Sequence, residues 1–505
     1  MAEPALTEKA PSNIEVDPSS AIIVDFDGPN DPYNPVNWPF AKKLVISLLY
    51  SLTSFGAVWA GSVYAAGNSQ VAAEFGVSSQ VAIIGTSLLL LGWGFGPLLW
   101  APLSELYGRK WPVLIPSFLS MIMSFGTAAA KDIQTVLITR FFTGFFGCAP
   151  ITCTGGVYVD VWDASQRGNA IVGYTLVVFG SGALAPVVGG AIINSGVSWR
   201  WTEYSTGILQ AFVLLLDLIF IKESYAPALL TTKARRLRRS TGNWALHAKW
   251  EEKGVVFKEL AIKFGLRPLQ LLLTPICLAI TVYTSFIYGI FYASLVSFPI
   301  IFQETRGWNK LTGSLPFLAI LIGLIPGGAI IYYNQRHYNK LFAGNDHKSA
   351  PEARLPPMMV ASVILAAGLF LSGWTASPKF HWIAPVIGVF MMGFGVYTIF
   401  TSALNYLIDV FPRWSASALA TNTFARSAFA AGFPLIVPPM YYRLGNEWAF
   451  TVFAIFAAWP NWPFDGGLQA ARATLLHAHL KELTGVIGWA GMLMGTDVGM
   501  DGYVG

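Results

Sequence analysis

The chain has 505 residues, of which 54% are hydrophobic and only 12% are charged, with a formal net charge of +5. Soluble domains carry roughly 25% charged residues, so this composition excludes a soluble domain and predicts an integral membrane protein. The small positive charge is explained by basic loops beside a membrane and implies no nucleic-acid partner. All three cysteines lie in apolar segments, which excludes a disulfide framework or a cysteine-based metal site.

The first 43 residues are polar and begin with an acidic stretch, without the basic and then apolar order of a signal peptide. We therefore expect 1–43 to be a polar segment in the cytoplasm. Within it, DPYNPVNWP at 31–39 contains three prolines and predicts an irregular lead-in that ends where the first helix begins.

Apolar runs of about 20 residues, the length that a membrane helix needs, follow in two groups. A polar, basic segment at 223–272, which includes KARRLRR at 233–239, separates six runs from five. The pattern predicts an all-α membrane protein of two similar six-helix bundles, 44–222 and 273–460, joined by a cytoplasmic loop. The expected helices are 44–66, 82–102, 112–130, 134–157, 168–193, 204–222, 274–299, 311–333, 357–376, 382–407 and 416–440.

The twelfth helix is expected to be short or defective. NEWAFTVFAIFAAWP at 446–460 offers only about 13 apolar residues, fewer than a span requires. The remaining 461–505 form an atypical tail. The segments expected on the same side of the membrane as the N-terminus contain more lysine and arginine than those on the other side, even when the central loop is left out. Because such basic residues are typical of cytoplasmic loops, we expect the N-terminus in the cytoplasm.

The end of the second helix reads APLSELYGRK at 101–110. Glu105 and Arg109 are four residues apart, the favourable order for a helical ion pair, and Gly108 permits a tight turn before Lys110. By itself this is a charged helix end. A short loop that carries both positive and negative charges could also hold the cytoplasmic side of a moving helix bundle closed.

The fourth helix contains Arg140 in ITRFFTGFFG, with no acid nearby in the sequence. Gly144 and Gly147 lie on the same helical face as Arg140, so they would let another helix approach beside the charge. We expect Arg140 to face protein, because charges within membranes usually line bundle interiors or pathways. The alternative is an arginine that snorkels to the outer surface.

The fifth helix contains GSGALAPVVGG at 180–190. Its small or helix-distorting residues share one stripe, which permits a close helix crossing and a bend. Such a helix could be a hinge or a seal, or the stripe could be ordinary packing of small residues. The residues concerned are Gly182, Pro186, Gly189 and Gly190.

Two further charges fall within spans. Asp217 lies within two turns of the cytoplasmic end of its helix, so we expect it to snorkel to water. Arg426 falls near mid-membrane and needs a partner, for which Asn405, Asp409 and Asn422 are the candidates. Other polar and aromatic residues could line a cavity, although such aromatics are more often packing: Phe141, Phe145, Gln210, Phe286, Phe291, Tyr292 and Tyr397.

Enzymatic and ATP-driven functions lack a sequence basis. The six histidines fall in loops, at a span border or in the tail, and no P-loop occurs, so no metal, cofactor or ATP is expected. An ion gradient is then the energy source. A proton-driven transporter needs an ionisable group, and arginine cannot release its proton, so Glu203 and Asp217 are the hypotheses for that acid.

The ordered motifs GPLLWAPLSELYGRK, RFFTGFFG, SGALAPVVGG and SASALATNTFARS resemble the fungal twelve-span drug:proton antiporters of the major facilitator superfamily over about 31–455. The resemblance implies that Arg140, with Gly144 and Gly147, couples proton movement to substrate. It also implies an antiporter pattern in the fifth helix and a cytoplasmic gate at Glu105, Gly108, Arg109 and Lys110. Ala185 stands where the family has a glycine, a departure that weakens the antiporter pattern.

We therefore expect alternating access by a proton-coupled antiporter that exports small organic molecules, such as drugs, polyamines or a specialised metabolite. Its partners would be substrate, protons and membrane lipid, and the protein would be a monomer. The expected location is the plasma membrane of a fungal cell, with the vacuolar membrane as the alternative. Proton-coupled uptake and a membrane sensor without transport remain the alternative functions.

Overall fold

The computed structural model describes residues 23–252, 267–344, 351–411 and 415–458. Within these ranges the chain is helical, and the only β-type pairing is an isolated bridge between Ile23 and His247. All eleven predicted spans coincide with helices. The prediction of an all-α membrane protein is confirmed.

The first half of the chain forms six spanning elements. The second of them is broken, because α3 and α4 are bent by 40° where they meet. A short helix, α2 (Asn68–Phe75), follows the first span. The six elements are α1 (Phe40–Val63), α3 (Ser79–Phe95) with α4 (Pro97–Tyr107), α5 (Trp111–Ala128), α6 (Ile133–Val161), α7 (Ala164–Asn194) and α8 (Arg200–Phe220).

The second half repeats this arrangement. Its last helix is interrupted at Gly445, where φ is 79° and two helical segments meet at a kink. Beyond that break, residues 446–458 pack on the preceding helices, and Trp374 donates its indole N–H to Thr451 over 3.2 Å. A twelfth helix therefore begins, and the tail at 461–505 lies outside the described residues. The helices are α13 (Pro275–Phe298), α14 (Pro316–Gly344), α15 (Pro356–Trp374), α16 (Ile383–Val410) and α17 (Ser415–Ala458).

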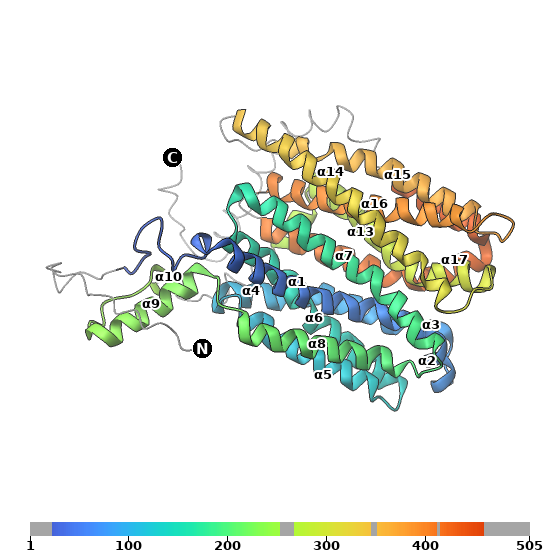
Figure 1. Cartoon of the computed structure of the whole chain (residues 1–505), viewed down its shortest axis with the longest axis horizontal. Helices are drawn as coiled ribbons and strands as arrows, with labels where there is room; N and C mark the ends of the chain where they lie inside the picture. Colours follow the sequence, from blue (N-terminus) through green and yellow to red (C-terminus); the bar gives the residue numbers. More distant parts are fainter. Residues whose placement is uncertain (1–22, 253–266, 345–350, 412–414, 459–505) are drawn as a thin grey trace, which may run out of the picture.

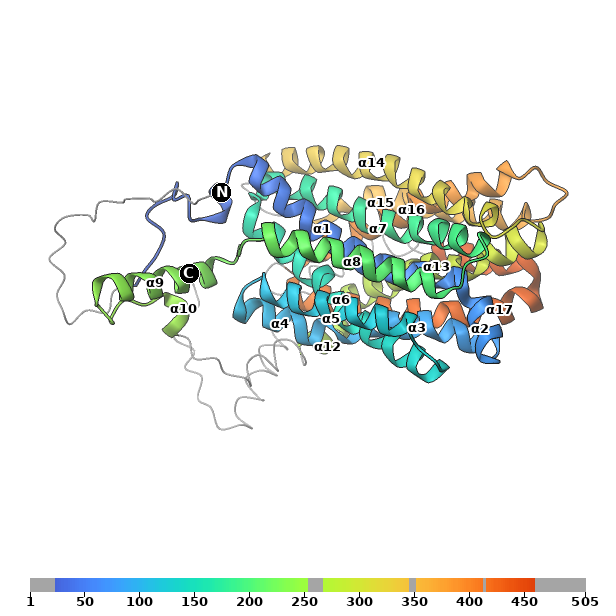
Figure 2. The same cartoon turned by 60° about the horizontal axis from the view of Figure 1, so that its bottom comes forward.

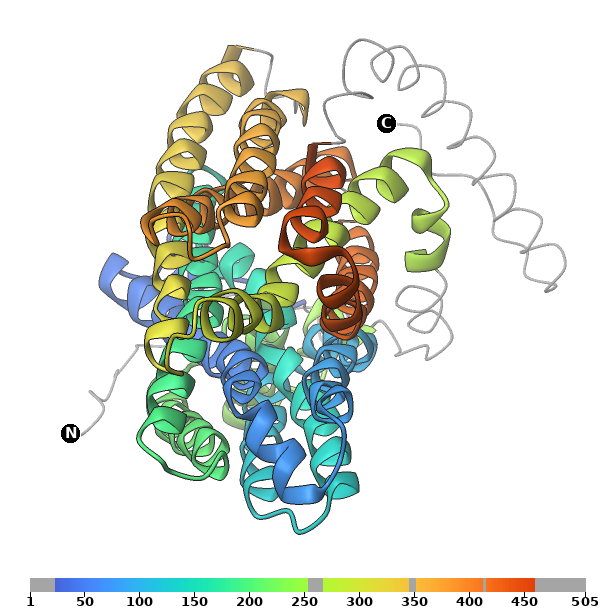
Figure 3. The ribbon, with the colours of Figure 1, turned by 90° about the vertical axis from the view of Figure 1, so that its right-hand side faces the viewer.

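The two halves lie side by side with their helices along a common long axis (Figures 1 and 3). Contacts between the halves run chiefly through α7 against α14 and α3 against α17. These two pairs bring α7 and α3 of the first half to the interface at which this type of fold places its transport pathway. The helices α5 and α8 lie at the outer side of the first half, away from α14 (Figure 1).

A small helical unit forms at the end of the bundle where α1 begins (Figures 1 and 2). The segment predicted as a basic loop contains α9 (Ala226–Thr241), α10 (Lys249–Glu252) and α12 (Arg267–Leu272). Lys233 on α9 pairs with Asp27 of the N-terminal segment over 2.8 Å, and Val24 of that segment is buried against Ala234. The N-terminal segment and the central segment are therefore held together at one end of the molecule.

Glycines set the closest helix contact of the first half. A Cβ added to Gly144 on α6 would collide with the backbone of Leu89 on α3, and a Cβ on Gly92 would lie 2.6 Å from the backbone nitrogen of Phe145. The backbones of α3 and α6 therefore touch, as the position of Gly144 in the sequence predicts. Gly147 lies on the same face, and a Cβ added to it would lie 3.2 Å from the Ser120 hydroxyl oxygen on α5.

We predict that Gly144→Ala destabilises the protein, because a methyl group at the crossing forces α3 and α6 apart. Overpacking of this kind costs roughly 1–3 kcal/mol. The melting temperature of the purified protein in detergent should fall. Gly155→Ala, on the same helix, is the matched control because nothing lies within 4 Å of its added Cβ. Equal melting temperatures for the two variants would contradict the assigned crossing.

Candidate transport and coupling site

Arg140 is fully buried in the first half and pairs with a carboxylate. Its Nη1 lies 3.1 Å from Oε1 of Glu203, which is also fully buried, on α8. The same Nη1 donates to the carbonyl of Ala60 over 2.7 Å, and Nε donates to the carbonyl of Gly85 over 3.2 Å. The expectation that Arg140 faces protein is confirmed, and it does not snorkel to the surface.

Four helices meet at this ion pair: α1 supplies Ala60, α3 supplies Gly85, α6 supplies Arg140 and α8 supplies Glu203. The guanidinium carbon also lies 4.3 Å from the centre of the Tyr64 ring, close enough for a cation–π contact. One guanidinium nitrogen and one carboxylate oxygen of the pair are buried without a hydrogen-bond partner. The pair is therefore desolvated and incompletely satisfied, an arrangement that is sensitive to the charge of either partner.

Asp217 is fully buried against α1 instead of reaching water. Thr53 on α1 donates its hydroxyl to Oδ2 of Asp217 over 2.6 Å, and Oδ1 has no partner. The prediction that Asp217 snorkels is wrong, because α8 turns this side chain toward α1 and not toward the membrane surface. A carboxyl group with one free oxygen in a buried position is a candidate proton-binding group.

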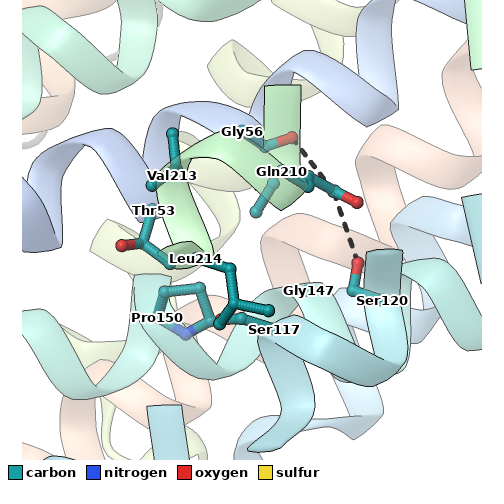
Figure 4. Close-up of a pocket in the computed structure, with 10 residues that line it drawn as sticks. Thr53, Gly56, Ser117, Ser120, Gly147, Pro150, Gln210, Val213 and Leu214 are labelled. Carbon is teal, nitrogen blue, oxygen red and sulfur yellow. Dashed lines mark hydrogen bonds between the residues drawn. The ribbon is translucent and has the colours of Figure 1, made fainter. Parts of the chain in front are cut away.

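A small cavity adjoins Thr53 between α1, α5, α6 and α8 (Figure 4). Its volume of about 20 Å³ is enough for one water molecule. Gln210 lies in its wall and donates to the carbonyl of Gly56 over 3.3 Å and to Ser120 over 3.5 Å. Gln210 therefore lines a cavity, as the sequence suggests, but that cavity lies inside the first bundle and next to the Asp217 hydrogen bond.

The turn after α4 is arranged differently from the helical ion pair that the sequence predicts. α4 ends at Tyr107 and Gly108 adopts a φ of 89°, so Arg109 is no longer on the helix that carries Glu105. Arg109 Nε pairs instead with Asp160 at the end of α6, over 2.8 Å. The positive φ of Gly108 removes the helical spacing between Glu105 and Arg109 on which the predicted pair depends.

The turn is also fixed by Glu223, which follows α8. The backbone N–H groups of Arg109 and Lys110 donate to its two carboxylate oxygens over 2.8 and 3.1 Å. Burial by itself lowers the pKa of the Arg109 guanidinium, but the Asp160 carboxylate outweighs this effect and raises the pKa above its ordinary value. Arg109 therefore stays charged, and the turn connects the ends of α4, α6 and α8.

The glycines of α7 face two different neighbours. A Cβ on Gly182 would lie 2.9 Å from the Phe291 ring of the second half, and one on Gly189 would lie 2.8 Å from the Val63 carbonyl of the first half. Gly190 faces Lys310 and Ser314 at the far end of the interface. The helix runs without a break through Pro186. The stripe thus permits close packing on both sides of α7, while its function as a hinge stays a prediction.

Arg426 on α17 contacts two aromatic rings. Its guanidinium carbon lies 5.0 Å from the centre of Tyr288 and 4.9 Å from that of Phe400. Asp409, one of its three predicted partners, pairs with Arg354 over 2.9 Å. Asn422 donates to Thr284 over 2.6 Å. The prediction of Asp409 as a partner is therefore wrong, because α16 directs that side chain toward Arg354.

The aromatic residues that were candidates for lining a cavity lie in three different parts of the structure. Phe291, Tyr292 and Tyr397 are buried near the interface between the halves, and the Tyr397 hydroxyl lies 3.0 Å from that of Thr175 on α7. Phe286 packs on Phe433 within the second half, at 5.3 Å between ring centres. Phe141 and Phe145 stack on each other on α6.

Sequence reasoning overlooked Asp160 and Glu223. Each follows a long apolar run and lies at or just after the C-terminal end of a helix. That position is a signal in itself, because an acid at the end of an apolar run lies close to the loops that connect the helices. Tyr64 was overlooked for a different reason, since an aromatic residue in an apolar helix gives no indication of a cation nearby. In the described residues no cluster of metal-ligating side chains occurs.

The chain matches known proteins over most of its length. The family model of the Major Facilitator Superfamily matches residues 48–434. The efflux pump bik6 of Gibberella fujikuroi is 51% identical over 443 residues, which cover 87% of this chain and 91% of that protein. The citrinin biosynthesis cluster MFS transporter mrr1 of Monascus ruber is 39% identical over 431 residues, which cover 85% of this chain and 86% of that protein.

A solved structure shares the fold. The xylose transporter XylE from E. coli, in a partially occluded inward open conformation, has a TM-score of 0.61 to this chain at 16% identity. The match covers 84% of this chain and 98% of that one. At this identity the likeness shows the arrangement of helices and nothing about the substrate.

We predict that Glu203→Gln is strongly destabilising because it leaves the Arg140 cation buried without a counter-charge. Breaking a buried ion pair costs roughly 3–5 kcal/mol. The double variant Arg140→Gln with Glu203→Gln contains no buried charge and should melt at a higher temperature than either single variant. The control is the partly exposed pair Arg200–Glu74, for which the same cycle should show a coupling of about 0–1 kcal/mol. Equal coupling in the two cycles would contradict a desolvated pair.

Proposed function

Because the chain belongs to the major facilitator superfamily, and is therefore a multi-pass membrane transporter, we propose that it is a proton-coupled antiporter that exports small organic molecules. The relative bik6 is an efflux pump, which supports export as the direction of transport. Alternating access between the two halves would carry the substrate.

The observation that carries this proposal is the buried Arg140–Glu203 pair where four helices meet. Protonation of Glu203 would remove the negative charge that compensates Arg140, and the guanidinium would then rely on the carbonyls of Ala60 and Gly85. Because α1, α3, α6 and α8 all contact this pair, a change in its charge would alter how they pack. Proton binding would in this way be connected to movement of the first half.

Asp217 is proposed as a second proton-binding group. It lies on the same helix as Glu203 and reaches the small cavity beside Gln210 through Thr53. A water molecule in that cavity could pass a proton between Asp217 and the groups around it, because its walls offer hydroxyl and amide partners. Helix α8 would then carry both acids, one near each end of the span.

The remaining predicted sites receive mechanical roles in the proposal. The cytoplasmic turn at Gly108, with Arg109 paired to Asp160 and both backbone N–H groups held by Glu223, would act as the gate on the cytoplasmic side. The α7 stripe, with Gly182 against Phe291 and Gly189 against Val63, would let α7 slide or bend between the halves. Breaking the Arg109–Asp160 pair would release the turn after α4 from the end of α6.

The proposed location is the plasma membrane of a fungal cell, with the N-terminus in the cytoplasm and the protein as a monomer. The basic residues of α9 and the pairing of Lys233 with Asp27 support this orientation, since they put the positive charge of the central segment on the same side as the N-terminus. The vacuolar membrane is the alternative location.

We predict that Asp217→Asn weakens proton-driven export without preventing insertion in the membrane, and that Glu203→Gln does the same when efflux is normalised to the amount of folded protein, because that variant is also destabilised. Both changes remove a proton-binding group and keep the shape of the side chain. A coupling between two sites is typically a factor of roughly 5 to 150, so accumulation against a gradient should fall by about that factor. Efflux of labelled compounds from loaded vesicles or cells, with and without a proton uncoupler, measures the effect.

The control for this experiment is Asp163→Asn, which alters an exposed carboxylate at the start of α7 with no side-chain cap hydrogen bond. Its efflux should equal that of the unaltered protein. Efflux that persists in the presence of the uncoupler, or that is unaffected by both acid substitutions, would rule out the proposed proton coupling.

A further inference from the structure

Arg426 has no counter-charge within the described part of the chain. It forms no ion pair and donates no hydrogen bond there, and its Nε is buried without a partner. Its guanidinium carbon lies 5.0 Å from the centre of the Tyr288 ring and 4.9 Å from the centre of the Phe400 ring. A cation inside a membrane bundle is costly unless another group compensates it, and two aromatic faces do so only partly.

The acids that might have compensated Arg426 are bound elsewhere. Glu203 pairs with Arg140, Asp160 with Arg109, and Asp409 with Arg354. Asp217 accepts a hydrogen bond from Thr53 in the first half. Among the described residues, these four carboxylates each have a hydrogen-bond or ion-pair partner other than Arg426, and Arg426 is left without a counter-charge.

Aromatic residues of both halves converge around Arg426. Phe179 on α7 packs on Phe400 at 5.1 Å and on Tyr288 at 6.4 Å between ring centres, and these are the two rings that the guanidinium contacts. Trp93 on α3 packs on Tyr292 at 6.0 Å. Helices α3 and α7 belong to the first half and α13, α16 and α17 to the second, so the cluster lies where the two halves meet.

This environment has two separate binding properties. The rings of Phe179, Tyr288 and Phe400 pack on one another and form an apolar aromatic environment, which favours an aromatic molecule. The planar guanidinium offers N–H donors in a fork that matches a carboxylate or a phenolate. A polyamine or a cationic drug would be repelled by Arg426, and no described carboxylate nearby would offset that repulsion.

We propose that the substrate is an aromatic organic anion, a carboxylate or a phenolate, and that Arg426 binds its charge while the surrounding rings bind its body. The proposal rests on the export function above for the fate of this ligand, but binding itself does not depend on proton coupling. Before the ligand enters, the cation–π contacts with Tyr288 and Phe400 hold Arg426 in place. On binding, the anion supplies the missing counter-charge.

The test compares three probes of one shape on the full-length protein in lipid nanodiscs: 2-naphthoic acid, methyl 2-naphthoate and 2-naphthylmethylamine. Isothermal titration calorimetry measures binding, without a proton gradient. A hydrogen bond to a charged group contributes enough to make the acid bind roughly tenfold to a hundredfold more tightly than the ester. The amine should bind more weakly than the ester because Arg426 repels it.

Three variants assign the preference to Arg426. Arg426→Gln should abolish the difference between acid and ester while leaving ester binding unchanged, and Arg426→Lys should retain part of it because the charge stays but the fork is lost. Arg443→Gln is the matched control, since Arg443 is exposed on the same helix. It should bind all three probes as the unaltered protein does.

The outcomes separate this inference from the proposed export. Acid binding that needs Arg426, together with efflux that does not need a proton gradient, supports the substrate class and overturns the coupling. If the acid binds no more tightly than the ester, or if Arg426→Gln leaves the preference intact, the anion assignment is overturned. Loss of ester binding in Arg426→Gln would also overturn it, because Arg426 would then support the aromatic cluster itself.

Discussion

The cost of burying charge in a membrane is the constraint on which the structure depends. A helix that crosses a bilayer can carry an arginine or a carboxylate only if protein groups compensate it, and those groups must come from other helices. Arg140 satisfies this condition with Glu203 and two backbone carbonyls. The pair therefore fixes how α1, α3, α6 and α8 are arranged around it.

Small residues make that arrangement possible. The carbonyl of Gly85 reaches Arg140 because α3 lies against α6, and the two helices touch at Gly92 and Gly144. A larger residue at either position would separate the backbones and lengthen the hydrogen bond to Gly85. The charge on α6 and the glycines on the same face thus depend on each other, since the glycines let α3 approach closely enough for the Gly85 carbonyl to accept a hydrogen bond from Arg140.

The two halves differ in how they treat a buried cation. In the first half the arginine is compensated by protein, and a second acid, Asp217, lies on the same helix as Glu203. In the second half Arg426 lies against the rings of Tyr288 and Phe400 and forms no ion pair within the described residues. Under the two proposals above, this difference gives distinct tasks to repeats of similar architecture: groups of the first half would bind protons, and Arg426 of the second half would bind the charge of a ligand.

The sequence by itself determined the class of protein and the positions of eleven helices. It also predicted that Arg140 faces protein and not lipid. These features could be predicted because apolar length and helical periodicity are local properties of the chain. It also identified Gly144 as a point of close approach. The tertiary structure decided which charges pair. Glu203 is 63 residues from Arg140, and Asp160 is 51 from Arg109. Asp409 joins Arg354 and not Arg426. Partners this distant meet only when helices pack, and the rotation of each helix then decides which of several nearby acids a given arginine reaches.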